Sequence, residues 1–273
     1  MSVPRLHQST AHTLLSESPH HAWYFHAELG GHQRKGSAAT QRGNVLDRML
    51  FGVGPELAVI DFSDFKTKAA QAARDEAEAA GKLVVLLDTY EKHRLFVEAV
   101  NAQLAEHRIV LSGESQVEVE WISPNGDVAC AGRMDHVLRH TMFRSSRLGG
   151  PLILDLKTCR KATEDAVAAS IVNYGYDIQY AAYTEAARVL GWGEPEMKFV
   201  FAETTEPYAL RIAPLAGTMK SLGEYKWRRA CLLWKECLEK NSFPGYPVTA
   251  IEAKAWHLAQ AVEDGDEAMD IHG

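Results

Sequence analysis

A short, strongly apolar segment that carries two opposite charges constrains the fold of this chain most. Residues 152–156, LILDL, are apolar enough for a strand at the centre of a sheet, and Lys157 follows directly. Side chains alternate along a strand, so Asp155 and Lys157 are expected on the same face. A charge in such a buried strand is costly unless a partner or a metal ion neutralises it. The chain is therefore expected to carry an ionic site against the middle of a sheet.

The segments around this strand predict helices on both sides of a hairpin and of further strands. Helical patterns cover the following stretches: 9–50 with a break at Pro19, 66–82, 89–107, 163–190 and 219–240. Strand patterns cover these: 114–121 and 128–138 around a turn at 123–126, then 152–156, 197–203 and 208–212. This order predicts an α/β or α+β fold with a central mixed β-sheet flanked by helices.

Length and charge indicate one domain with an acidic end. We expect a single domain over residues 1–259, with a helical N-terminal module over about 1–110, a core over about 111–215 and a C-terminal helix over about 216–241. The formal charge of -7 argues against a chain that coats nucleic acid through overall positive charge, although it allows a local basic groove. Residues 260–273 hold five acids and no Lys or Arg, so they are expected to form a flexible tail. The remainder has 31 acids against 29 bases and is close to neutral.

The sequence shows no membrane segment and no cysteine cluster. The longest aliphatic run, residues 83–87, is too short to cross a bilayer, and the first ten residues lack the apolar stretch of a signal peptide. We therefore expect a cytoplasmic protein. Cys130, Cys159, Cys231 and Cys237 have no CxxC spacing, which favours free thiols over a zinc site or an iron-sulfur cluster.

The chemistry is expected where two carboxylates meet an ammonium group. Asp135 ends the motif GRMD in the second strand of the hairpin, and it is expected to converge with Asp155 and Lys157. Two carboxylates, the backbone carbonyl of Leu156 and waters suit Mg²⁺, with Mn²⁺ as a substitute. Lys157 could then orient a water and stabilise the charge that develops on a phosphate. Taken alone, the Asp155 and Lys157 pair favours a salt bridge at a strand edge, with Asp135 capping a turn, because motifs of three residues occur by chance. The flanking motifs reverse this preference.

Three motifs together resemble a known nuclease superfamily. GRMD, followed by ILDLKT and then by YDIQYAAY, resembles the PD-(D/E)XK superfamily, and specifically the exonuclease VIII (RecE-like) type of phages and prophages. That type is related to lambda exonuclease and to the RecB nuclease domain. The resemblance implies a restriction-endonuclease-like core in which Asp135 and Asp155 bind the metal and Lys157 is the catalytic lysine.

The resemblance also assigns roles to residues outside the central strands. The QxxxY motif of the family falls on Gln179 and Tyr183, which would line the site from one side of the helix that begins at about Tyr176. Upstream, QRGNVLDRMLFG resembles the segment in which a glycine precedes a metal-binding histidine by four positions. That slot holds Asp47, so the resemblance implies Asp47 as a third metal ligand.

Charged side chains near these motifs have two possible readings. Arg133, Arg160 and Lys161, together with Arg144 and Arg147, could form a positive rim that binds DNA phosphates, or they could be solvated loop charges. Alternation places Glu118 and Glu120 on one face, where one of them could complete a second metal site or both could be ordinary surface charges.

The resemblance implies a Mg²⁺-dependent DNA exonuclease that digests linear double-stranded DNA from its 5′ ends and leaves 3′ overhangs for recombination or repair. Its implied partners are duplex DNA ends, a single-strand annealing protein and further copies of the same chain in a ring. Two alternatives stay open. One is a RecB-like single-strand nuclease or an endonuclease of a repair or defence system, and the other is a DNA-binding module without catalysis, which the Asp47 substitution would favour.

Overall fold

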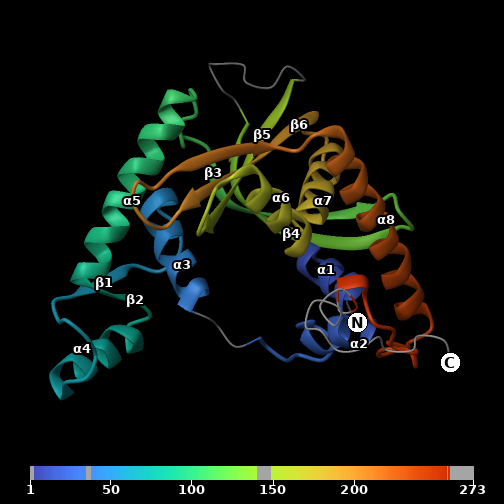
Figure 1. The fold of residues 1–273 in the computed structure, drawn as a ribbon, viewed down its shortest axis with the longest axis horizontal. Coiled ribbons are helices and arrows are strands. Elements are labelled where there is room, and N and C mark those ends of the chain that lie inside the picture. Colours follow the sequence, from blue (N-terminus) through green and yellow to red (C-terminus); the bar gives the residue numbers. More distant parts are fainter. Residues whose placement is uncertain (1–2, 35–37, 140–148, 257, 259–273) are drawn as a thin grey trace.

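A five-stranded mixed sheet lies between two layers of helices (Figure 1). The computed structural model describes residues 3–34, 38–139, 149–256 and 258. The sheet has the order β3-β4-β5-β6-β7, in which β5 and β6 are parallel and the other neighbours are antiparallel. Its strands are β3 (Glu114–Ser123), β4 (Val128–Leu138), β5 (Gly149–Cys159), β6 (Glu194–Glu203) and β7 (Leu210–Pro214). The predicted mixed sheet with flanking helices is therefore confirmed.

Each face of the sheet has its own layer of helices because the side chains of the strands alternate. Ile153, Phe199 and Phe201 pack with the helices of one layer, and Leu154 and Val200 pack with those of the other. The first layer holds α1 (Gln8–Ser16), α2 (Pro19–Phe25), α6 (Glu164–Asn173), α7 (Tyr176–Val189) and α8 (Gly217–Glu239). The second layer holds α3 (Ala38–Phe51) and α5 (Leu87–Glu106). Both faces of β5 are thus covered, as its apolar sequence predicts.

Strand β4 changes its partner halfway along, and this opens a fork in the sheet. Its last residues, His136 to Leu138, pair with Leu154 to Leu152 of β5. Its first half instead bonds to the N-terminal segment, where the Leu6 N–H donates to the Ala129 carbonyl at 2.8 Å and the Ala131 N–H donates to the Leu6 carbonyl at 3.1 Å. The middle of β4 and the end of β5 therefore separate, and space opens between them.

Polar anchors fix α7 against the sheet and against α8. Glu185 accepts hydrogen bonds from the indole nitrogens of Trp121, at 2.9 Å, and Trp227, at 3.0 Å, which come from β3 and α8. Asp177, which is fully buried, forms an ion pair with Lys226 of α8 at 2.6 Å. Buried carboxylates need such partners. These contacts set the orientation of the helix that carries Gln179.

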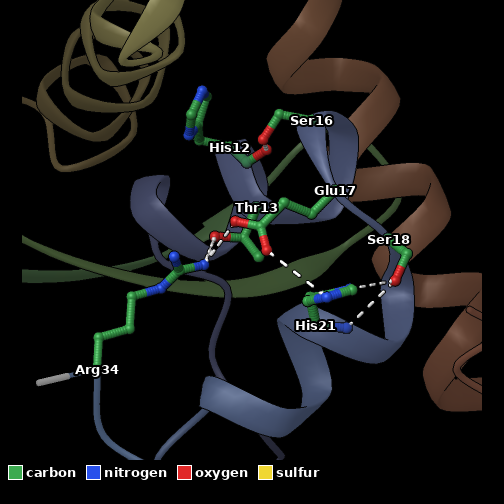
Figure 2. A network of polar contacts seen from close by, with 7 residues as sticks. All are labelled: His12, Thr13, Ser16, Glu17, Ser18, His21 and Arg34. Carbon is green, nitrogen blue, oxygen red and sulfur yellow. Dashed lines mark hydrogen bonds and ion pairs between the residues drawn. The ribbon is translucent and has the colours of Figure 1, made fainter.

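Polar contacts fix the corner between α1 and α2 (Figure 2). Ser18 precedes α2, and its hydroxyl accepts from the His21 N–H while Pro19 begins the helix, so the predicted break at Pro19 is confirmed. Arg34, which follows α2, reaches back to α1 and contacts Glu17 at 2.7 Å and Thr13 at 3.3 Å. These contacts tie α1, α2 and the segment after α2 to one another.

The sequence patterns missed one part of the N-terminal module and misplaced several boundaries. Between α3 and α5 lie β1 (Leu57–Ile60) and β2 (Leu83–Leu86), which form a small parallel sheet, with α4 (Lys68–Ala79) between them. These elements project from the N-terminal end of α5 (Figure 1). The pattern over 163–190 splits into α6 and α7 because Gly175 adopts the left-handed region with φ 69°. Strand β5 is also longer than expected.

Two further expectations concern segments at the limits of the structure. The expected basic loop, with Arg144 and Arg147, and the expected tail over 260–273 lie outside the described residues. Among the residues that the structure describes, no helix is both long enough and apolar enough to span a membrane.

Candidate active site at the strand fork

The fork between β4 and β5 brings the predicted carboxylates and the lysine together. Along β5, Asp155 and Lys157 follow Ile153 on the face that α7 covers, whereas Leu154 and Leu156 face the other layer. The Asp155 side chain is fully buried, and Lys157 Nζ forms an ion pair with its Oδ1. Asp155 and Lys157 therefore share one face, as the alternation predicts.

Asp135 reaches the same place from β4. Its Oδ2 accepts a hydrogen bond from the backbone N–H of Leu156 at 3.2 Å, so the side chain crosses the fork to β5. Burial, followed by repulsion from Asp155, raises the pKa of Asp135 to about 8. The carboxylates therefore repel each other within a poorly solvated site, and a bound cation would favour their ionised forms.

Lys157 is held from two sides. Burial alone would lower the pKa of Lys157, but Asp155 and Asp135 raise it above its usual value. Its Nζ also lies 4.4 Å from the centroid of the Tyr176 ring, in the geometry of a cation–π contact. The ammonium is thus kept charged and in a fixed position.

Helix α7 places both residues of the QxxxY motif at the site. Gln179, which is 4% exposed, donates from Nε2 to Asp155 Oδ2, while its Oε1 is buried with no hydrogen-bond partner among the described residues. Tyr183 lies one turn further along, and its hydroxyl donates to the Arg133 carbonyl at 2.7 Å. Burial raises the pKa of Tyr183, so the hydroxyl keeps its proton. Gln179 orients Asp155, and Tyr183 fixes the backbone of β4 next to Asp135.

The glycine of the GRMD motif makes room for Tyr183. A Cβ atom on Gly132 would lie 2.6 Å from Tyr183 Cε1, which is too close for any side chain. Overpacking of this kind costs roughly 1–3 kcal/mol. We expect Gly132→Ala to lower the free energy of unfolding in urea by that amount, whereas Gly217→Ala, where no atom lies within 4 Å, should leave it nearly unchanged. Equal stability of the two variants would contradict this role of Gly132.

Asp47 approaches from the other layer. Its helix, α3, packs through Leu46 against the face opposite α7. Burial raises the pKa of Asp47, repulsion from Asp155 adds to the rise, and Arg133 opposes it. The Asp47 carboxylate accepts a long hydrogen bond from Gln116 Nε2, at 3.5 Å. Asp47 therefore acts electrostatically on the site, but its role as a metal ligand stays a prediction.

The donor set fits a hard divalent cation that keeps part of its hydration shell. No three His, Cys, Asp or Glu side chains in the described part of the chain gather closely enough to form a complete protein cage. Mg²⁺ does not need one, because it is commonly held by one or two carboxylates, with waters and substrate phosphates completing the shell. Asp135 and Asp155 provide the carboxylates, and the buried, unpartnered Gln179 Oε1 offers an acceptor beside them. The proposed Leu156 carbonyl ligand stays a prediction.

The predicted phosphate-binding residues separate into two places. Arg133 is exposed and lines the cleft at the fork, a cavity of about 580 Å³ that also touches Asp135, Lys157, Gln179 and Tyr183. Arg160 and Lys161 are exposed too, but they line a second cavity beyond the end of β5. Of the predicted phosphate-binding residues that the structure describes, Arg133 alone lines the cleft that holds the carboxylates.

The two hairpin glutamates line the same cleft. Glu120 forms an ion pair with Arg5 at 3.0 Å, and Arg5 also lies 3.8 Å from Glu28. Glu118 lies directly opposite Arg133 in the register of the β3–β4 ladder. Both glutamates face cationic neighbours, so nothing in these contacts requires a second metal ion.

Two contributors to the site had little or no signal in the sequence. Tyr176 lies three residues before Gln179 on α7, and that spacing could have placed it on the same side of the helix. Arg5 enters the cleft because Leu6 pairs with β4, and no sequence pattern indicates this pairing.

Comparisons with known proteins address the fold. The family "PDDEXK-like domain of unknown function (DUF3799)" matches residues 15–250. A "Putative exonuclease" from Eubacterium rectale, known from a crystal structure, aligns at 13% identity over 93% of this chain and 92% of its own, with a TM-score of 0.60. A phage-related exonuclease from Haemophilus somnus 129PT aligns at 13% identity over 87% of this chain and 96% of its own, with a TM-score of 0.34. No curated protein sequence matches.

At such low identity, the likeness to the Eubacterium rectale protein shows a shared fold and nothing more. The family match is independent of it and spans most of the sequence. The two findings agree with each other and with the motifs at the strand fork. The chain belongs to the PDDEXK-like family, as the resemblance of its motifs to the PD-(D/E)XK superfamily predicts.

Proposed function

We propose that this protein is a Mg²⁺-dependent exonuclease that digests linear double-stranded DNA from its 5′ ends and leaves 3′ single-stranded overhangs. The observation that carries the proposal is the buried Asp155 carboxylate, which contacts Lys157 and Gln179 beside Asp135. An ion pair with a purely structural role would need neither the second carboxylate, Asp135, nor the buried acceptor without a partner, Gln179 Oε1. The family match and the fold support nuclease chemistry, and the exonuclease mode and the polarity rest on the motif resemblance.

In this proposal each residue of the cluster has its own task. When bound at Asp135 and Asp155, a divalent cation would polarise the scissile phosphate and lower the pKa of a coordinated water. Lys157 supplies a fixed positive charge for the negative charge that develops on the phosphate. Gln179 holds Asp155 in one orientation, and Tyr183 holds the backbone of β4 beside Asp135. Arg133 is an exposed cation of the cleft that would contact the DNA backbone.

A comparison of DNA substrates tests this function. We expect the protein, with Mg²⁺, to release 5′-terminal label from linear duplex DNA and to leave covalently closed circles intact, and EDTA should abolish the reaction. Mn²⁺ should replace Mg²⁺. Cleavage of circles would indicate an endonuclease, and preference for single strands would indicate a RecB-like enzyme. Binding of DNA without hydrolysis in either metal would indicate a module without catalysis.

The assembly and partners of the protein are also proposals. A ring of several copies would let an acidic exterior surround a positive channel, and a single-strand annealing protein would receive the 3′ overhangs. Light scattering combined with gel filtration measures the number of copies directly, and a monomer at working concentration would contradict the ring.

A further inference from the structure

A second large cavity lies at the end of β5, where Thr158, which lines it, directly follows Lys157 of the active-site cleft. Its volume is about 950 Å³, and it is lined by residues from α3, the end of β5, α6 and the segment after β6. Three of the lining residues are cations: Arg42, Arg160 and Lys161. Thr158 and Thr205 also line the cavity. Nothing in the proposed hydrolysis accounts for this cavity.

The charges of the two cavities differ. The active-site cleft is lined by Glu28, Glu118, Glu120 and Asp135 as well as by its cations, so it does not attract a polyanion by charge alone. The second cavity is lined by three cations and by no acid in the part of the chain that the structure describes. Its cations also form no ion pair with any described residue. In a chain of net charge -7, unpaired positive charge gathered in one concave place favours an anionic ligand.

An exposed aromatic ring links this cavity to the catalytic lysine. Tyr174 lines the cavity, and its side chain is 63% exposed. Its ring centroid lies 5.7 Å from that of Tyr176, and Lys157 Nζ lies 4.4 Å from the Tyr176 ring. Arg160 lies just past the end of β5, three residues after Lys157, which corresponds to about 10 Å of extended chain. A strand leaving the active site would reach the cavity within a few nucleotides.

We propose that this cavity binds single-stranded DNA, with Tyr174 stacking on an unpaired base and Arg42, Arg160 and Lys161 contacting phosphates. The proposal rests on the proposed nuclease function, because it assigns the cavity to a strand of that substrate. Sites for single strands combine a positive groove with aromatic side chains on which bases stack. Bases in a duplex have their faces covered by neighbouring base pairs, so a tyrosine on a cavity wall selects an unpaired strand.

A surface on α8 provides a matched comparison. Tyr225 is 54% exposed and is followed on α8 by two exposed cations, Arg228 and Arg229. Two carboxylates, Glu185 and Glu224, line the cavity next to them, so this surface lacks the one-sided charge of the second cavity. Variants of this surface therefore remove a tyrosine ring and two cations, as variants of the second cavity do, but at another place on the molecule.

Fluorescence anisotropy of a short labelled oligothymidylate, measured with the full chain in EDTA to prevent cleavage, tests the proposal. We expect Tyr174→Ala to weaken binding about 10-fold or more, and Tyr174→Phe to bind as the wild type does, because stacking needs the ring and not the hydroxyl. Arg160→Ala/Lys161→Ala should reduce the slope of log K against log salt by about 1.4, since each phosphate contact on a single strand contributes about 0.7. Tyr225→Ala and Arg228→Ala/Arg229→Ala should bind as the wild type does. Equal losses from both sets of variants would overturn the proposal.

The four cysteines allow a second test, which shows where on the protein the single strand binds. Cys159 lines the second cavity and is partly exposed, whereas Cys130, Cys231 and Cys237 are buried. We expect the oligothymidylate to slow alkylation of Cys159 by a maleimide several-fold in the native protein, with Cys159→Ser identifying the labelled thiol. An unchanged rate of alkylation at saturating oligonucleotide would overturn the proposal even if the protein binds single strands.

The two proposals can fail separately. If the protein binds the oligothymidylate through Tyr174 but hydrolyses no DNA, the proposal for the cavity is supported and the proposed nuclease function is contradicted. If the protein digests linear duplex DNA but Tyr174→Ala binds single strands as the wild type does, the nuclease function stands and the cavity proposal fails.

Discussion

Replacement of Lys157 by alanine is expected to lower the rate of DNA hydrolysis about 100-fold to 1,000-fold, the range found when one preorganised stabilising group is removed from an active site. The ammonium is held by Asp155 and by the Tyr176 ring, so it is in place before the substrate binds. The reduction should appear in kcat with a small change in KM, because the interaction strengthens as charge develops on the phosphate. Single-turnover release of end-labelled nucleotides measures the effect.

The neighbouring strand offers a matched control for this variant. Lys198 on β6 forms an ion pair with Glu196, two residues earlier, at 2.9 Å, and its side chain is 19% exposed against 18% for Lys157. We expect Lys198→Ala to hydrolyse DNA within about twofold of the wild-type rate. Far-ultraviolet circular dichroism checks that both variants fold. A folded Lys157→Ala protein with undiminished activity would contradict the catalytic role of Lys157.

Replacement of Lys226 by methionine is expected to destabilise the protein by roughly 3 kcal/mol. The variant leaves the fully buried Asp177 carboxylate without its cation, and removal of one partner from a buried pair typically costs about 3–5 kcal/mol. The lower end of that range applies because the Lys226 side chain is 24% exposed. The loss should also reduce activity, since Asp177 anchors the turn of α7 that carries Gln179. Urea unfolding measures the change in free energy.

An exposed pair at the C-terminal end of the same helix is the control for Lys226→Met. Lys240 contacts Glu236 at the same distance, 2.6 Å, but both side chains are largely exposed. We expect Lys240→Met to change stability by less than about 1 kcal/mol. The double variant Asp177→Leu/Lys226→Met should recover part of the loss, because a buried ion pair can often be replaced by apolar side chains. Equal effects of Lys226→Met and Lys240→Met would contradict the burial argument.

The part of the site that lies on one strand could be predicted from the sequence. Alternation along an apolar strand is enough to place Asp155 and Lys157 on one face, and helical spacing is enough to place Gln179 and Tyr183 on one side of α7. These are local rules, and the structure follows them. The same rules predicted the hairpin and the mixed sheet, although they gave β5 as a shorter strand than the observed Gly149–Cys159.

The features of the fold and of the site that the sequence did not predict depend on contacts between segments far apart in the sequence. The strands β1 and β2 have only four residues each, and an aliphatic run of that length does not distinguish a strand from other buried structure. Arg5 reaches the cleft because Leu6 pairs with β4, and Asp47 approaches the site from the opposite helix layer. The separation of Arg160 from the carboxylates follows from the length of β5 past Lys157. None of these arrangements has a local signature.

In the proposed function, Asp135 and Asp155 hold a divalent cation that serves hydrolysis of a DNA phosphate. Electron paramagnetic resonance of Mn²⁺, titrated into the protein with a duplex whose end linkages resist hydrolysis, tests it most directly, because the phosphate is then present to complete the metal shell. We predict bound Mn²⁺ with the wild type and its loss with Asp155→Asn, whose side chain keeps its shape but not its charge. Equal Mn²⁺ binding by the two proteins, or none by the wild type, would contradict the account.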